Sequence, residues 1–111
     1  MISQRDVVLL AVPFSEFKES KIRPGIVVSN DSYNKRFEDI IVVPMTTNLN
    51  LREYAIMITN QNMESGKLIK DSKIKVDRIF SVSQKLVRMK IGRVKKEIHE
   101  KIKKTISELI N

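Results

Sequence analysis

Residues 39–46 read Asp-Ile-Ile-Val-Val-Pro-Met-Thr and contain four β-branched residues in succession. Such residues are enriched in strands, so this stretch predicts the strongest strand of the chain. Pro44 has no N–H to give to a ladder, which predicts an edge or a bulge at that point. The segment Thr47-Asn48-Leu49-Asn50 then predicts a turn.

Extended segments lie on both sides of this strand. Four more stretches predict strands, and they are residues 6–14, 26–29, 54–58 and 68–82. In the last of these, Ile74, Val76 and Arg78 are expected to share one face. The charged residues 15–22 predict a loop, and residues 30–34 have the capping chemistry of a helical turn.

The C-terminal third has a different period. Apolar residues recur there at spacings of three and four, namely at Ile91, Val94, Ile98, Ile102, Ile106 and Leu109. This predicts an amphipathic helix from about Val94 to Ile110, and Ser83 is a candidate cap for a shorter helix before Gly92. Strands followed by a helix predict a single α+β domain over residues 1–111, with a barrel-like antiparallel sheet.

The composition favours a polyanionic partner. The formal charge is +8, with 21 Lys and Arg against 13 Asp and Glu in 111 residues. Such a surface attracts nucleic acid, although a merely solvated, lysine-rich surface explains the charge as well. Aromatic residues make up only 5%, which disfavours a module that binds bases mainly by stacking. The N-terminus lacks the apolar core of a signal peptide and no run is long enough to span a bilayer, so we expect a cytoplasmic protein with no membrane contact.

Several chemistries are excluded by the residues themselves. The chain has no Cys and a single histidine, His99, so thiolate sites, histidine clusters and a ribonuclease with two catalytic histidines cannot be built. The acidic residues are scattered, and no phosphate-binding glycine loop occurs, so we expect neither a metal nor a cofactor. His99 is expected to be an ordinary surface histidine. Cleavage of RNA through its own 2′-hydroxyl remains possible, since the substrate brings the nucleophile.

Four segments follow one another in a recognisable order that spans almost the whole chain: residues 6–8 with 12–15, residues 21–30, residues 41–48, and residues 72–79 with the later residues 91–94 before the terminal helix. The second holds Arg23-Pro24 before an apolar strand, and the third is a strand that reaches Thr46. In this order they resemble the MazF/PemK family of toxin endoribonucleases. The resemblance implies an SH3-like β-barrel, a homodimer, metal-independent cleavage of single-stranded RNA at short motifs, and neutralisation by a cognate antitoxin. The charge of +8 suggests an acidic antitoxin segment.

The resemblance also assigns catalytic residues. Arg23 occupies the family's catalytic arginine position, where a guanidinium can bind the scissile phosphate and offset its developing charge. Thr46 matches the catalytic threonine, and Asp77 matches an acidic position that some members use, where it could accept the 2′-OH proton. The alternatives are a surface arginine beside a proline, a strand threonine and an exposed ion pair.

Further residues are expected to contact RNA because they lie in or beside the predicted site. These candidates are Lys18, Lys21, Thr47, Asn48, Lys75 and Arg78. Lys75 is expected to share a strand face with Asp77. For all of these residues, ordinary solvated charges and turn positions are the competing interpretation.

Two other functions stay open on the sequence alone. The first is a basic SH3-like barrel that binds nucleic acid or a protein target such as gyrase without cutting anything, since a fold does not fix a function. The second is a structural or ribosome-associated basic protein. Metal-free cleavage of RNA separates the nuclease from both.

Overall fold

The computed structural model describes residues 1–13 and 20–111. The described residues form eight strands: β1 (Asp6–Pro13), β2 (Ser20–Val27), β3 (Asp39–Thr46), β4 (Ala55–Ile58), β5 (Met63–Gly66), β6 (Ser72–Lys75), β7 (Phe80–Ser83) and β8 (Val87–Val94). They also form two α-helices, α1 (Asp31–Arg36) and α2 (Lys96–Ile110), and the short 3-10 helices η1 (Asn60–Asn62), η2 (Val76–Arg78) and η3 (Gln84–Leu86).

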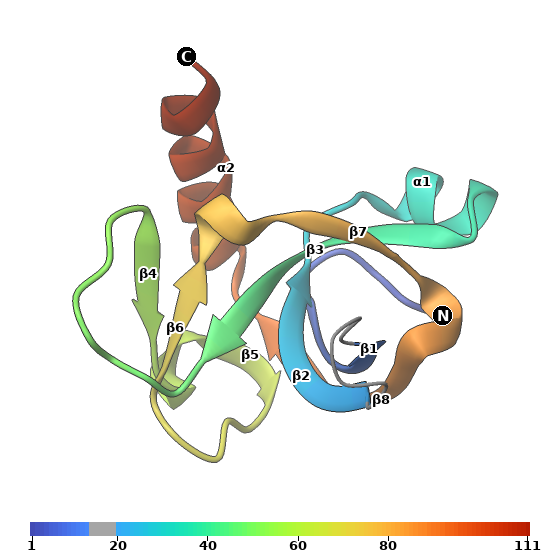
Figure 1. The fold of residues 1–111 in the computed structure, drawn as a ribbon, viewed down its shortest axis with the longest axis horizontal. Helices are drawn as coiled ribbons and strands as arrows, with labels where there is room; N and C mark the ends of the chain where they lie inside the picture. Colours follow the sequence, from blue (N-terminus) through green and yellow to red (C-terminus); the bar gives the residue numbers. More distant parts are fainter. Residues whose placement is uncertain (14–19) are drawn as a thin grey trace.

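The strands pair in the order β4-β6-β3-β2-β1-β8-β5, and β7 pairs with β3 beside this path. Every pair is antiparallel. Figure 1 shows the sheet curled into a half-barrel, with the C-terminal helix α2 standing at one side. The predicted α+β class, with a barrel-like antiparallel sheet and a terminal helix, is confirmed.

Both faces of the central strands are buried. Consecutive residues of a strand point to opposite faces, and at Val42 and Val43 both side chains are fully buried. One face packs against α2 through Ile98 and Ile102, and we call this the helix-side core. The other face turns into the curl of the sheet, and we call its buried residues the inner core: Val8, Leu10, Val27, Ile40 and Val42.

The predicted helices follow from local chemistry. Asn30 caps α1 by accepting a hydrogen bond of 2.8 Å from the Tyr33 N–H. The helix α2 begins at Lys96 and ends at Ile110, close to the predicted bounds. None of the helices among residues 1–13 and 20–111 is long and apolar enough to cross a membrane.

The loop predicted over residues 15–22 is wrong at its end. Residues 14–19 lie outside the described part of the chain, but β2 already begins at Ser20. Lys21 pairs with Val12 and Ile22 with Ala11 in the β1–β2 ladder. The charged residues of this segment favour a loop in the sequence. They are also compatible with a strand, because side chains at an exposed end of a ladder need not be apolar.

The continuous strand predicted within residues 68–82 is also wrong. The chain forms β6, turns through η2 and resumes as β7. The buried Val76 donates its N–H to Tyr54 O at 3.2 Å, so the turn is held from outside the ladder. Arg78 therefore does not share a strand face with Ile74, and Lys75 does not share one with Asp77.

The short helix predicted before Gly92 is wrong as well. Ser83 does act as a cap, accepting from the Lys85 N–H at 3.2 Å, but only for the single turn η3. The chain then extends as β8, which contains Ile91 and Val94. The helical prediction for these two residues is wrong because their spacing from Ile98 fits a helical period as well as a strand.

Candidate active site

The registers of three strands bring Arg23, Thr46 and Lys75 to one face of the sheet. In the β2–β3 ladder Gly25 pairs with Pro44, and continuing that register by two residues places Arg23 opposite Thr46. In the β3–β6 ladder Met45 pairs with Ile74, so the next step places Lys75 opposite Pro44. Residues opposite one another on neighbouring strands point to the same face.

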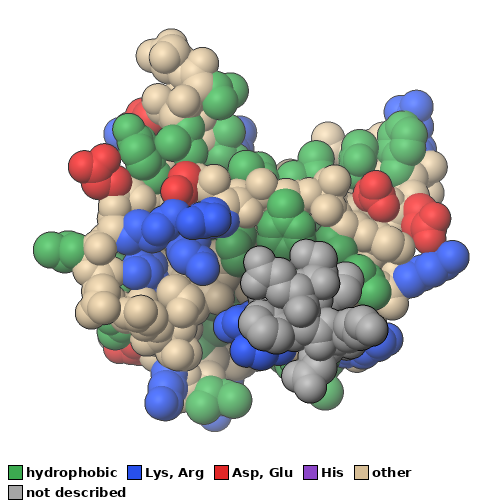
Figure 2. Space-filling view, viewed as in Figure 1, with side chains coloured by type: hydrophobic (Ala, Val, Ile, Leu, Met, Phe, Trp, Pro, Cys, Tyr) green, Lys and Arg blue, Asp and Glu red, His purple; other side chains and the backbone are tan. Residues whose placement is uncertain are grey.

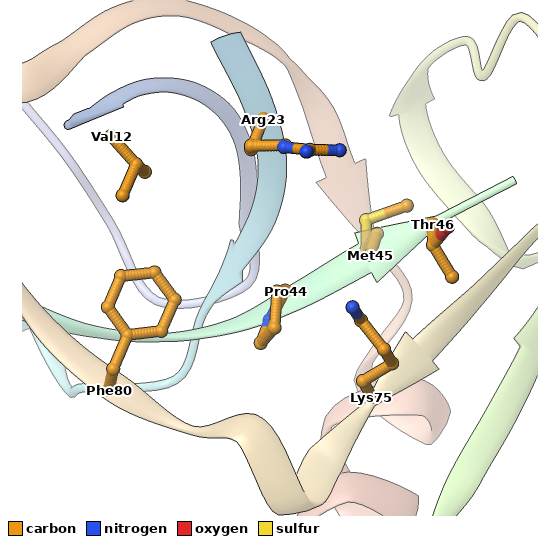
Figure 3. Close-up of a pocket in the computed structure, with 7 residues that line it drawn as sticks. All are labelled: Val12, Arg23, Pro44, Met45, Thr46, Lys75 and Phe80. Atoms are coloured by element: carbon orange, nitrogen blue, oxygen red, sulfur yellow. The ribbon is translucent and has the colours of Figure 1, made fainter. Parts of the chain in front are cut away.

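This face forms a pocket of about 260 Å³. It is lined by Val12, Arg23, Pro44, Met45, Thr46, Lys75 and Phe80. Figure 3 shows the Arg23 guanidinium extending over β3 toward Thr46, while the Lys75 side chain rises from β6 toward the same strand. The three polar groups that the sequence predicted on separate strands therefore meet in one hollow.

The pocket lies where β3 changes its pairing partner, at Pro44. On one side of β3, the pairing with β7 ends at Val42 and the pairing with β6 begins at Met45. Pro44 lies between these two partners, where η2 carries the chain away from the sheet. The prediction of an edge or a bulge at Pro44 is therefore wrong. The strand β3 lies inside the sheet, and its pairing is interrupted on one side at Pro44, where a residue without an N–H is tolerated.

The Thr46 hydroxyl is oriented by the turn that follows it. The Asn48 N–H donates to Thr46 Oγ1 at 3.2 Å, and the Asn50 N–H donates to Asn48 Oδ1 at 3.0 Å. A hydroxyl has one donor hydrogen and two acceptor lone pairs. Accepting from Asn48 leaves its hydrogen available for a ligand in the pocket.

Lys75 is surrounded by other cations. Burial, followed by the positive charges of Arg52, Arg78, Arg23 and Lys73, lowers the pKa of its ammonium group below the ordinary value. We call these five residues the cationic patch. Figure 2 shows Lys and Arg side chains gathered over β6 and the turn that follows it. A concentration of positive charge at a hollow attracts a phosphodiester.

Asp77 lies outside the residues that line the pocket, in an ion pair with Arg52. Arg52 Nη2 is 2.6 Å from Asp77 Oδ2, and Arg52 Nε donates to Asp77 Oδ1 at 3.2 Å. This bidentate geometry joins η2 to the segment between β3 and β4. The nearly buried Lys73 holds the same segment, because its ammonium donates to Asn50 O at 2.5 Å.

The other residues that were predicted to contact RNA do not all lie beside the pocket. Lys21 is exposed on β2, two residues from Arg23 and on the same face. Arg78 and Asn48 are exposed beside the pocket. Thr47 faces the other way and lines a separate, mostly apolar hollow with Pro24, a residue of the opposite face. Lys18 lies outside the described residues.

Sequence reasoning missed three residues of this region. Lys73 could have been found, because Lys73 and Lys75 alternate on a strand and must share a face. Arg52 and Phe80 had no local signal, since Arg52 reaches the site by its ion pair and Phe80 by the change of partner at Pro44.

His99 is not the surface residue that was expected. It is half-buried, and its Nδ1 has no hydrogen-bond partner among the described residues. Burial, followed by the positive charge of Lys103, lowers the pKa of its imidazole. The residue lies on α2 and is not one of the described residues that line the pocket.

No group of three or more potential metal-ligating side chains occurs among residues 1–13 and 20–111. The positive charge at the hollow comes from side chains of the cationic patch. The arrangement is that of a cationic pocket with a threonine hydroxyl among its lining residues.

Similar folds occur among solved structures. An endoribonuclease in complex with its cognate antitoxin from a mycobacterial species has a TM-score of 0.79 at 16% identity, with 99% of this chain and 95% of that chain covered. A MazE–MazF structure from Deinococcus radiodurans has a TM-score of 0.81 at 13% identity, with 98% and 95% covered. No curated protein sequence is significantly similar to the chain. At such identities the likeness shows a common fold.

The family follows from the sequence as a whole. The model of the PemK-like, MazF-like toxins of type II toxin–antitoxin systems matches residues 3–110. The chain therefore belongs to this family.

Proposed function

We propose that the protein is a toxin endoribonuclease that cleaves single-stranded RNA without a metal ion. The observation that carries the proposal is the meeting of Arg23, Thr46 and Lys75 in one pocket. It is supported by the family and by the endoribonuclease identity of a protein with the same fold. The substrate supplies its own nucleophile, so the protein has to align the 2′-hydroxyl and stabilise the reacting phosphate.

Each polar group has a part in this reaction. The 2′-hydroxyl loses its proton to solvent water as its oxygen attacks phosphorus, the bond to the 5′-oxygen breaks, and the products carry a 2′,3′-cyclic phosphate and a 5′-hydroxyl. Arg23 holds the phosphate through its planar donors and offsets the added negative charge. The Thr46 hydroxyl donates to a phosphate oxygen and fixes its position. Lys75 gives a proton to the leaving 5′-oxygen.

The partners follow from the same proposal. We infer a cytoplasmic homodimer that is held inactive by a cognate antitoxin with an acidic segment, because the net charge is +8 and the site lies in the cationic patch. Lys21, Asn48, Lys75 and Arg78 are proposed to contact RNA at the mouth of the pocket. Lys18, which lies outside the described residues, and Thr47, which lines the opposite hollow, are proposed to contact RNA beyond this mouth.

The test is incubation of purified protein with a long single-stranded RNA in EDTA, followed by sequencing of the 5′ ends of the fragments. The expected result is cleavage at a short motif, with a cyclic or 3′-phosphate on one product and a 5′-hydroxyl on the other. RNA that is shifted in a gel but not cut indicates the non-catalytic binding barrel instead. Salt-sensitive binding to many RNAs, with no toxicity on expression, indicates the structural protein.

The proton-donor role of Lys75 predicts a pH dependence. The ammonium form is the active one, and its pKa is lowered. Cleavage should therefore fall as the pH rises through a value below about 10.4, the ordinary pKa of lysine. Arginine stays charged across this range, so Lys75→Arg should remove the decline. The measurement is the single-turnover rate against pH, corrected for uncatalysed hydrolysis, and an unchanged decline in Lys75→Arg contradicts the role.

Asp77 is predicted to position the neighbouring segment through Arg52 and not to act as the general base. Asp77→Asn should lower the cleavage rate by about fivefold, the scale of a partly exposed ion pair. Arg52→Ala should have the same effect, and the double variant should lose no more. A loss of a hundredfold or more in Asp77→Asn, with loss of the acidic limb of the pH profile, would instead support the general-base role.

A further inference from the structure

We propose that the apolar half of the pocket is a nucleobase subsite, in which a base next to the scissile phosphate stacks on the ring of Phe80. The proposal rests on the proposed function and adds a residue that recognises the substrate. Nothing in the assignments of Arg23, Thr46 or Lys75 requires such a contact, because those groups handle only the phosphate and the sugar hydroxyl.

The inner core is open at the pocket. Phe80 pairs with Val42, and Val42, Pro44 and Thr46 alternate along one face of β3. Val42 is fully buried, whereas Phe80 and Val12 are half-buried and line the hollow. The face that forms the inner core thus continues into the pocket, where the side chains of Val12 and Phe80 are partly exposed.

The two halves of the pocket differ in chemistry. Figure 3 shows Val12 and Phe80 on one side, and Arg23, Thr46 and Lys75 on the other, with Pro44 between them. A phosphate bound by the three polar groups carries a nucleoside on each side. One of the two attached bases can reach the apolar half without a further nucleotide in between. A nucleotide carries a charged phosphate beside a flat base. The hollow therefore offers cationic groups to the phosphate and apolar side chains to the base.

Phe80 is suited to this contact. It is the one aromatic residue that lines the pocket among residues 1–13 and 20–111. Bases stack on aromatic rings with little dependence on their identity, because every base has a π-face, and one such contact changes affinity by roughly 5- to 150-fold. A stacked base next to the scissile phosphate would also fix the sugar between them, and so the direction of the 2′-hydroxyl.

The experiment compares RNA oligonucleotides that the protein binds but cannot cut. The sequence comes from the fragment ends of the EDTA assay, and the nucleotide at the cleavage position carries a 2′-deoxy sugar. Two further oligonucleotides replace the base on one or the other side of the scissile phosphate with an abasic site. Their Kd values are measured by fluorescence anisotropy for the wild-type protein and for Phe80→Leu, which keeps an apolar side chain against the inner core but lacks the ring.

Two results are expected together. In the wild-type protein, one of the two abasic substitutions weakens binding about tenfold, and Phe80→Leu weakens binding of the intact oligonucleotide by a similar factor. In Phe80→Leu, the same abasic substitution costs less than twofold, because the contact has already been lost. Phe37 provides the matched control, since it is an exposed aromatic residue at the end of α1, and Phe37→Leu should leave every Kd unchanged.

The proposal is overturned if neither abasic oligonucleotide binds the wild-type protein more weakly, a comparison that needs no variant to fold. It is also overturned if the abasic penalty is the same in Phe80→Leu. Failure of the proposed function has a different signature, because the wild-type protein would then leave the all-ribose oligonucleotide uncut.

Discussion

Arg23→Ala is expected to slow RNA cleavage by a hundredfold or more and to relieve the growth arrest that we predict on expression of the wild-type protein. Arg23 lines the pocket with Thr46 and Lys75, and its planar guanidinium is proposed to be the bidentate donor at the phosphate. Loss of one preorganised donor to a developing oxyanion costs about 3 kcal/mol in the barrier, which corresponds to this factor. The measurement is the single-turnover rate with saturating protein.

Two controls separate this effect from loss of charge or of fold. Arg23→Lys keeps the charge but not the two parallel donors, so only a small part of the rate should return. Arg36→Ala removes an exposed arginine from α1, outside the pocket, and should cut RNA at the wild-type rate. Growth arrest that persists in Arg23→Ala, with the variant protein folded and expressed, would rule out the catalytic role of Arg23.

Gly92→Ala is expected to destabilise the protein by about 3 kcal/mol and to lower its Tm by roughly 10–20 °C. Gly92 pairs with Gly66 where β5 meets β8. A Cβ on Gly92 would overlap the carbonyl oxygen of Ser65, come within 2.7 Å of the Met63 methyl group and lie 3.1 Å from Gly66 Cα. Two of these neighbours are backbone atoms, so the strands would have to separate.

Gly25→Ala is the matched control for this prediction. The added Cβ would lie 3.3 Å from Val43 O and 3.5 Å from a Leu10 methyl group, which is close but not overlapping. Its Tm should fall by only a few degrees. The measurement is thermal unfolding followed by circular dichroism, and equal Tm values for the two variants would contradict the close approach of β5 and β8.

The sequence predicted the elements that depend on local pattern. The strand from Asp39 to Thr46 has the predicted bounds, because four β-branched residues can be buried on both faces only in the centre of a sheet. The terminal helix was predicted nearly to its ends for the same kind of reason, since Ile98 and Ile102 recur on one face.

The sequence did not correctly predict elements whose residue spacing fits both a strand and a helix. In β8, Val87, Met89 and Ile91 alternate with Arg88 and Lys90 at the period of a strand. This alternation overlaps the helical spacing that starts at Ile91, and the longer helical pattern predicts the wrong structure for Ile91 and Val94. The turn η2 had no pattern at all, because it is fixed by a hydrogen bond to the distant Tyr54.

The site was predictable in part. The resemblance named Arg23 and Thr46, and the strand registers explain why they face one another. The surroundings of Asp77 were out of reach, because its partner Arg52 lies 25 residues earlier in the chain. The apolar half of the pocket was equally hidden, since it depends on how β3 changes partner at Pro44.

The most direct test is a crystal structure of the protein with an RNA oligonucleotide that carries a 2′-deoxy sugar at the cleavage position. We predict that one phosphate accepts hydrogen bonds from the Arg23 guanidinium and the Thr46 hydroxyl, with Lys75 beside its 5′-oxygen. RNA that lies instead along the lysines of α2, with no phosphate in this pocket, would contradict the account.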